Sequence, residues 1–315
     1  MNVIKKKRKW PLVLLAIVLI PVTLIGGLFI WASLKPAISK NYYEKVDTGG
    51  EIEARYTAMG EHEVKFVKFD AFQNYKAYEI WYPADLDNSQ QQYPLVIMAN
   101  GTGVPASKTK AIFKHLASWG FIVVGNEDEF SWNGFSSYMS LNYMLKLNKN
   151  VDSIFYQKVD TENIGIAGHS QGRVGVVNAV TNYDNGSMYK AVFAASPTCN
   201  ELAAGLEWDF DLSKINIPYF SVAGTGKLDA ETISPLDQMK EDFKTIPNIM
   251  PKIMARRTGI DHGQTLSHAD GYMTAWFMYW LQSDTKAGNA FLGEHAEILA
   301  NSNWQDIERS YDSSK

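Results

Sequence analysis

The chain has 315 residues, of which 46% are hydrophobic and 13% aromatic, which is enough apolar material for a sizeable core in one large or two ordinary domains. Its formal net charge is −4, and removing the five positive charges of residues 5–9 leaves −9 on the remainder, which argues against nucleic-acid binding. Cys199 is the only cysteine, so the sequence excludes an internal disulfide and zinc sites built on paired cysteines.

An N-terminal membrane anchor is the first element that the sequence predicts. Residues 10–34 carry no charged side chain and follow a basic tail, residues 1–9. A helix of about 25 residues crosses a bilayer core of about 30 Å with some tilt. Because positive residues stay in the cytoplasm, we expect a single-pass cell-membrane protein that is extracytoplasmic after residue 35. A cleaved signal peptide is the competing interpretation, although its apolar stretch is usually shorter. The polar residues 35–62 predict a juxtamembrane stalk before a folded domain, residues 63–315.

The sequence after the stalk alternates between strand and helix patterns. Residues 95–99 form a continuous apolar run, which is typical of a strand buried on both faces. Other strands are predicted over residues 64–69, 77–81, 121–124, 164–167, 190–195, 217–223 and 251–255, and helices over residues 108–119, 138–147, 172–182, 235–245 and 269–282. The alternation predicts an α/β fold with a mostly parallel central sheet and helices on both faces.

A candidate nucleophile lies in the turn Gly168-His169-Ser170-Gln171-Gly172, between a buried-strand pattern and a helix pattern. A Gly-x-Ser-x-Gly in this context is a nucleophile elbow, in which the sharp turn exposes the serine hydroxyl and leaves no room for a Cβ atom at either glycine. We therefore expect Ser170 to be the nucleophile. His169 is expected to point away from it and to pack.

A serine hydroxyl becomes a good nucleophile when a histidine takes its proton and a carboxylate orients that histidine. His262 directly follows the last predicted strand and is the candidate base, ahead of His268, which is expected to begin the next helix. Asp229 follows the strand over residues 217–223 and is the first candidate acid. Glu231 is its rival, and Asp261 ranks third because sequence neighbours rarely orient each other's side chains well.

The developing negative charge on a tetrahedral intermediate needs preorganised N–H donors. The backbone N–H of Gln171 is one candidate, because it follows the nucleophile. The second should come from the loop after residues 95–99, where Thr102 is the candidate and Gly103 the near alternative.

Together these residues resemble the α/β-hydrolase superfamily over residues 77–282, within the branch of cutinase-like polyester hydrolases, dienelactone-hydrolase-like proteins and platelet-activating-factor acetylhydrolases. The resemblance rests on the elbow, on Asn100-Gly101-Thr102 where the branch often has His-Gly before an oxyanion-hole residue, and on Ala275-Trp276 after His262. Two features depart from it. Arg173 follows the elbow where the branch has a small residue, and the cutinase-like spacing of acid to proline fits Glu231 and Pro235 rather than Asp229.

The resemblance implies hydrolysis of a small-molecule or lipid-like carboxylic ester through an acyl-enzyme, with no metal and no cofactor. A peptidase or amidase could use the same residues, and a catalytically silent surface-binding domain is a third hypothesis. An aromatic group could line the substrate pocket or belong to the core, and consists of Phe130, Trp132, Phe135 and Tyr138. The connection between residues 195 and 217 is too short for a large lid, so we expect a site open to bulky or surface-bound esters.

Overall fold

The computed structural model describes residues 35–71 and 75–310. Its strands are β1 (Val64–Asp70), β2 (Ala77–Pro83), β3 (Tyr93–Ala99), β4 (Ile122–Asn126), β5 (Val159–His169), β6 (Tyr189–Ala195), β7 (Tyr219–Gly224), β8 (Lys252–Arg257) and β9 (Trp304–Ser310). Its helices are α2 (Glu51–Thr57), α3 (Lys110–Ser118), α4 (Phe135–Lys149), α5 (Gln171–Thr181), α6 (Asn200–Gly205), α7 (Leu236–Thr245), α8 (His262–His268), α9 (Asp270–Gln282), α10 (Thr285–Gly288) and α11 (Glu297–Ala300).

One mostly parallel sheet organises the described part of the chain, as the sequence predicts. It has nine strands in the order β1-β2-β4-β3-β5-β6-β7-β8-β9. The strands from β4 to β8 run parallel, whereas β1, β2 and β9 pair antiparallel at the two edges. Parallel strands end at the same edge of the sheet, so the loops that follow β3, β5, β7 and β8 can meet there.

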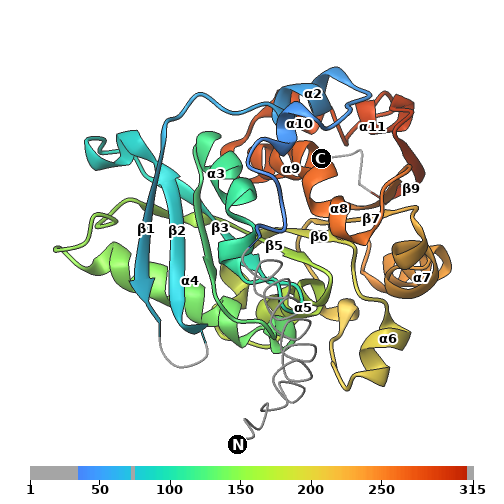
Figure 1. Cartoon of the computed structure of the whole chain (residues 1–315), viewed down its shortest axis with the longest axis horizontal. Coiled ribbons are helices and arrows are strands. Elements are labelled where there is room, and N and C mark those ends of the chain that lie inside the picture. The colour runs from blue at the N-terminus through green and yellow to red at the C-terminus, as the bar shows by residue number, and fades with distance from the viewer. Residues whose placement is uncertain (1–34, 72–74, 311–315) are drawn as a thin grey trace, which may run out of the picture. The chain divides into compact units, whose positions relative to one another are not determined.

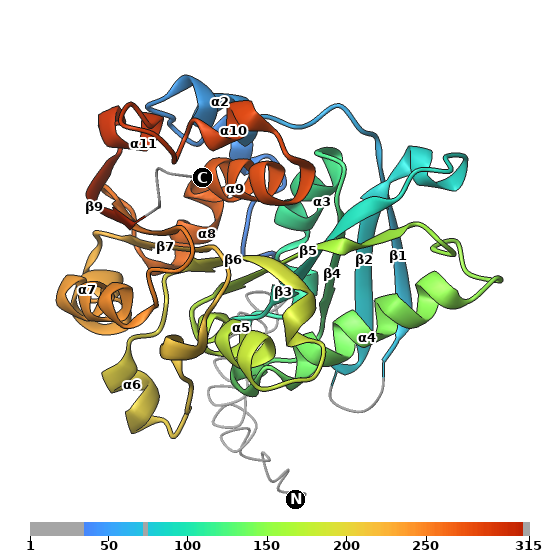
Figure 2. The ribbon, with the colours of Figure 1, turned by 180° about the vertical axis from the view of Figure 1, so that it is seen from behind.

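Helices cover both faces of the sheet (Figures 1 and 2), with α3 and α9 on one face and α4 and α5 on the other. The position of β3 between these two helix layers explains why its sequence is apolar throughout. Val96 and Met98 belong to the core cluster on the α3 and α9 face, whereas Leu95 and Ile97 belong to the cluster on the α4 and α5 face. Side chains alternate along a strand, so a strand covered on both faces needs apolar residues at every position.

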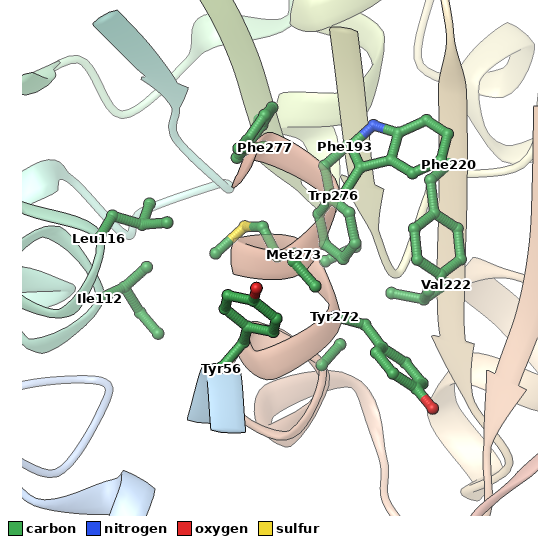
Figure 3. Close-up of a cluster of buried hydrophobic side chains, with 14 of the residues drawn as sticks. Tyr56, Ile112, Leu116, Phe193, Phe220, Val222, Tyr272, Met273, Trp276 and Phe277 are labelled. Carbon is green, nitrogen blue, oxygen red and sulfur yellow. The ribbon is translucent and has the colours of Figure 1, made fainter. Parts of the chain in front are cut away.

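The helix α9 forms the centre of the larger core cluster (Figure 3). Trp276 is fully buried, and its ring centroid lies 5.5 Å from that of Phe220 on β7. Its indole N–H donates to the carbonyl oxygen of Val192 on β6, at 3.0 Å. This contact satisfies the one polar group of a large apolar side chain and fixes α9 against the sheet.

The prediction of a stalk over residues 35–62 is wrong from Ala37 onwards. The compact unit of the described chain begins at Ala37 rather than at residue 63. Tyr56 on α2 is fully buried against α9, and Tyr42 donates its hydroxyl to the buried carboxylate of Asp270. Glu53, also on α2, is buried and accepts hydrogen bonds from Asn301 and Trp304, each at 2.8 Å. Glu53 is thus one of the charged residues that suggested a solvated stalk, and its carboxylate is hydrogen-bonded inside the domain.

The predicted membrane anchor, residues 10–34, lies outside the described residues. Within residues 35–71 and 75–310, no helix combines the length and the apolar character needed to cross a bilayer.

Candidate active site

Ser170 lies in the turn between β5 and α5, and its backbone has the strained geometry of an elbow. Its φ is 58° and its ψ is −122°, a region of backbone conformation that residues other than glycine rarely occupy. A Cβ at Gly168 would come within 2.4 Å of the carbonyl oxygen of Gly172, and one at Gly172 within 2.5 Å of that of Ala99. The Ser170 N–H donates to the carbonyl oxygen of Ala195, at 2.9 Å. The two glycines therefore allow the close packing that holds Ser170 at the edge of the sheet.

Asp229 holds His262 by a direct contact. The two side chains come from the loops after β7 and β8, and His262 Nδ1 lies 2.8 Å from Asp229 Oδ1. Donation from Nδ1 leaves Nε2 as the acceptor of the neutral ring. The other carboxylate oxygen accepts from Ser196 Oγ at 2.6 Å, Gly224 N at 2.7 Å and Thr265 Oγ1 at 3.1 Å. Asp229 begins a single π-helical turn, Asp229–Ile233, a distortion that is frequent at functional sites.

The environment of Asp229 favours its charged form. The side chain is fully buried, and burial alone would raise its pKa. Hydrogen bonds from His262, Ser196 and Gly224 outweigh that effect and hold the pKa of Asp229 below its ordinary value. The carboxylate is therefore ionised beside the imidazole at neutral pH.

The two other candidate acids lie elsewhere. Glu231 has a largely exposed side chain, 4.0 Å from Lys227 and away from His262. Asp261 caps α8, where Oδ1 accepts from the N–H of His262 at 2.8 Å and from the N–H of Asp229 at 2.9 Å. Asp261 thus joins the backbone of the acid loop to the start of α8 and does not contact the imidazole nitrogens. The proline spacing that suggested Glu231 does not correspond to the contact that the structure makes.

Ser170 and His262 line the same pocket, which has a volume of about 190 Å³. Thr102 lines it too, on the loop after β3, and its Oγ1 accepts from the Gln171 side-chain Nε2 at 3.0 Å. The N–H of Gly103 donates to the carbonyl oxygen of Glu129 at 3.2 Å, so that group is already used. Between the two alternatives on this loop, the geometry favours the N–H of Thr102 over that of Gly103 as an anion donor.

His169 is a pocket residue that the sequence interpretation missed. We expected its side chain to pack away from Ser170, but it lines the same pocket. Its Nε2 donates to the carbonyl oxygen of His262 at 2.9 Å, and the two ring centroids are 4.6 Å apart. Burial, together with the nearby His262, lowers the pKa of His169 to about 4, so its ring is neutral at pH 7. The positive φ of Ser170 breaks the extended backbone at this point, so His169 and Ser170 do not alternate in direction as neighbours in a strand do.

Arg173 and the aromatic group do not line this pocket in the described part of the chain. Arg173 is buried, pairs with Asp242, and donates to the carbonyl oxygen of Thr198 at 3.0 Å. Phe130 is 61% exposed and borders a separate hollow together with Trp132. Phe135 stacks on Tyr138, with ring centroids 5.7 Å apart. Phe130 therefore fits neither interpretation of the aromatic group, because it belongs neither to the Ser170 pocket nor to the core.

No curated protein matches the chain. Residues 41–308 match the PET hydrolase-like (PETase) family, and this range contains the elbow, Asp229 and His262. With most of its length matched, and with a nucleophile elbow on a mostly parallel sheet, the chain belongs to the PET hydrolase-like family, a cutinase-like group of α/β-hydrolase serine esterases.

Proposed function

We propose that this protein is a membrane-anchored, extracytoplasmic serine esterase that cleaves carboxylic esters through an acyl-enzyme. The observation that carries the proposal is the contact of 2.8 Å between His262 Nδ1 and Asp229 Oδ1, next to a pocket that Ser170 and His262 share. Family membership supports ester hydrolysis in general.

The reaction follows from these positions. Ser170 Oγ attacks the ester carbonyl carbon while His262 Nε2 takes the hydroxyl proton, and Asp229 stabilises the resulting imidazolium. The carbonyl oxygen becomes negative and is stabilised by the N–H groups of Gln171 and Thr102. Collapse of this intermediate breaks the bond to the alcohol, which leaves with the proton from His262. A water then attacks the acyl-enzyme, with His262 again as the base, and releases the acid and the free Ser170.

A fluorophosphonate probe tests the nucleophile directly. We expect covalent labelling of the full chain in detergent, loss of labelling in Ser170→Ala, and normal labelling in Ser213→Ala, which removes an exposed serine hydroxyl on the 3₁₀ turn Leu212–Lys214. Folding of each variant is checked by circular dichroism. A folded wild type that is not labelled would contradict the esterase and favour a silent binding domain. Turnover of peptide amides in preference to acyl esters would favour a peptidase or amidase.

The membrane location is supported by the sequence of residues 1–34, which has a basic start followed by an uncharged stretch. We expect the full chain to remain in the membrane fraction at alkaline pH and to be cleaved by protease added outside intact cells. A chain that lacks residues 1–36 should be recovered in solution. Release of the full chain at alkaline pH would contradict the anchor.

A further inference from the structure

A segment distant in sequence closes part of the pocket around Ser170. Ala37 and Ile38 line this pocket together with Val104, Thr109 and Leu266. The family match begins at residue 41, so Ala37 and Ile38 contribute a wall from outside the matched range. This wall, made by Ala37 and Ile38, could not be anticipated from the family resemblance.

The wall is fixed at both ends. The N–H of Ala37 donates to the carbonyl oxygen of Lys108 at 2.9 Å. Ile38 is only 7% exposed and belongs to the core cluster that contains α3 and α9. Tyr42 follows it, buried and hydrogen-bonded to Asp270. Because its ends are bonded to separate parts of the domain, the wall has little freedom to move aside for a large substrate.

The pocket is small for a ligand site. Its volume is about 190 Å³, whereas pockets for drug-sized ligands hold roughly 300 to 1,000 Å³. A cavity below that range has little room for a long chain once the ester function itself is inside it. Among the described residues that line the pocket, none is Asp, Glu, Lys or Arg, so a charged group would have no partner there.

We propose that Ala37 and Ile38 restrict this site to esters with a short, uncharged acyl group, a substrate class that rests on the proposed esterase function. The acyl group stays attached to Ser170 through both steps of the reaction, whereas the alcohol leaves after the first, so we place the acyl chain in the pocket, where an added carbon meets the packed wall. This restriction replaces the open site for bulky esters that a missing lid suggested.

The test is a chain-length series of p-nitrophenyl esters, from acetate through butyrate and hexanoate to decanoate, with the full chain in detergent. One methylene in an apolar pocket changes discrimination by about tenfold or more. We therefore expect wild-type kcat/KM to fall at least about tenfold beyond butyrate. Ile38→Ala should raise the hexanoate-to-acetate ratio of kcat/KM by about tenfold, and Ile38→Val by less. Ile298→Ala is the matched control, because Ile298 is buried in the same cluster but does not line the pocket.

The outcomes separate the two proposals. A wild-type profile that is flat or rises with chain length would overturn the restriction, and so would an Ile38→Ala ratio equal to that of Ile298→Ala. If Ile38→Ala does not fold, the wild-type profile and Ile38→Val still decide. Absence of hydrolysis for every ester, together with absence of fluorophosphonate labelling, would instead contradict the esterase function itself.

Discussion

At the residue scale, Asp229 contacts His262 and Glu231 does not, and this difference makes the identity of the acid testable. Asp229 is buried and bonded to His262, whereas Glu231 is exposed beside Lys227. Asp229→Asn keeps the shape but removes the charge and favours the wrong imidazole tautomer, so we expect kcat to fall by roughly 10⁴-fold. Glu231→Gln should leave kcat near the wild-type value. Steady-state kinetics on acetate esters measures both, and the reverse result would assign the acid to Glu231.

Thr102 and Gln171 are joined by their side chains as well as by their proposed backbone roles. The Gln171 amide donates to Thr102 Oγ1 at 3.0 Å, which sets the distance between the loop after β3 and the start of α5. Thr102→Val keeps the backbone N–H but loses this link, so we expect kcat to fall by about tenfold, less than the 10² to 10³ typical of a lost donor. Thr102→Ser keeps the hydroxyl and should retain kcat. Equal kcat in the Val and Ser variants would mean that the link does not position the donor.

At the scale of elements, local patterns predicted the sheet and the elbow but missed several elements, among them α8 and β9 near the end. The run that became β3 and the turn before α5 carry their signals within a few residues. The helix α8 was missed because Gly263 and the polar residues after it favour helix only weakly. The capping box of Asp261 and Gln264 was the one local signal for its start. The strand β9 is half-exposed and rich in charge, and it is stabilised by pairing with β8, which is distant in sequence.

The ion pair between Arg173 and Asp242 connects α5 to α7 and explains the large residue after the elbow. Burial raises the pKa of Asp242 even with Arg173 beside it, so its charge depends on the partner. Arg173→Met leaves that carboxylate buried without a counter-ion, and we expect a loss of about 3 to 5 kcal/mol in the free energy of unfolding. The double variant Arg173→Met with Asp242→Leu should recover much of this loss. Urea denaturation of the wild type, Arg173→Met, Asp242→Leu and the double variant measures the coupling between the two side chains, and purely additive losses would contradict it.

At the scale of the whole molecule, the N-terminal segment shows what composition cannot reveal. Ile38, Tyr42 and Tyr56 are separated by charged residues, so the segment has no apolar periodicity. Each of the three nevertheless packs into the core, against residues distant in sequence. The two-residue wall at the pocket was unpredictable for the same reason, since nothing local in Ala37 and Ile38 indicates an approach to Ser170. The sequence predicted the candidates Ser170, His262 and Asp229, and the structure adds the residues that shape the space around them.

A buried network joins this N-terminal segment to the rest of the domain and should make stability depend on pH. His115 on α3 contacts Asp270 on α9 at 2.6 Å through Nδ1, and its Nε2 donates to the carbonyl oxygens of Thr57 and Ala58. Burial alone would lower the pKa of His115, but the Asp270 carboxylate and the carbonyl oxygens raise it above its ordinary value.

A raised folded-state pKa means that the stabilisation from His115 is complete below pH 6.5, its ordinary pKa, and is lost as pH rises through the folded-state value. Each unit of difference in pKa corresponds to about 1.4 kcal/mol. We expect the free energy of unfolding of the wild type to exceed that of His115→Gln most at pH 6, and the gap to narrow towards pH 9. Asp270→Asn should remove the same pH dependence, because the imidazolium then loses its counter-ion. Urea denaturation across this range measures the gap, and a constant gap would mean that folding does not raise the pKa of His115.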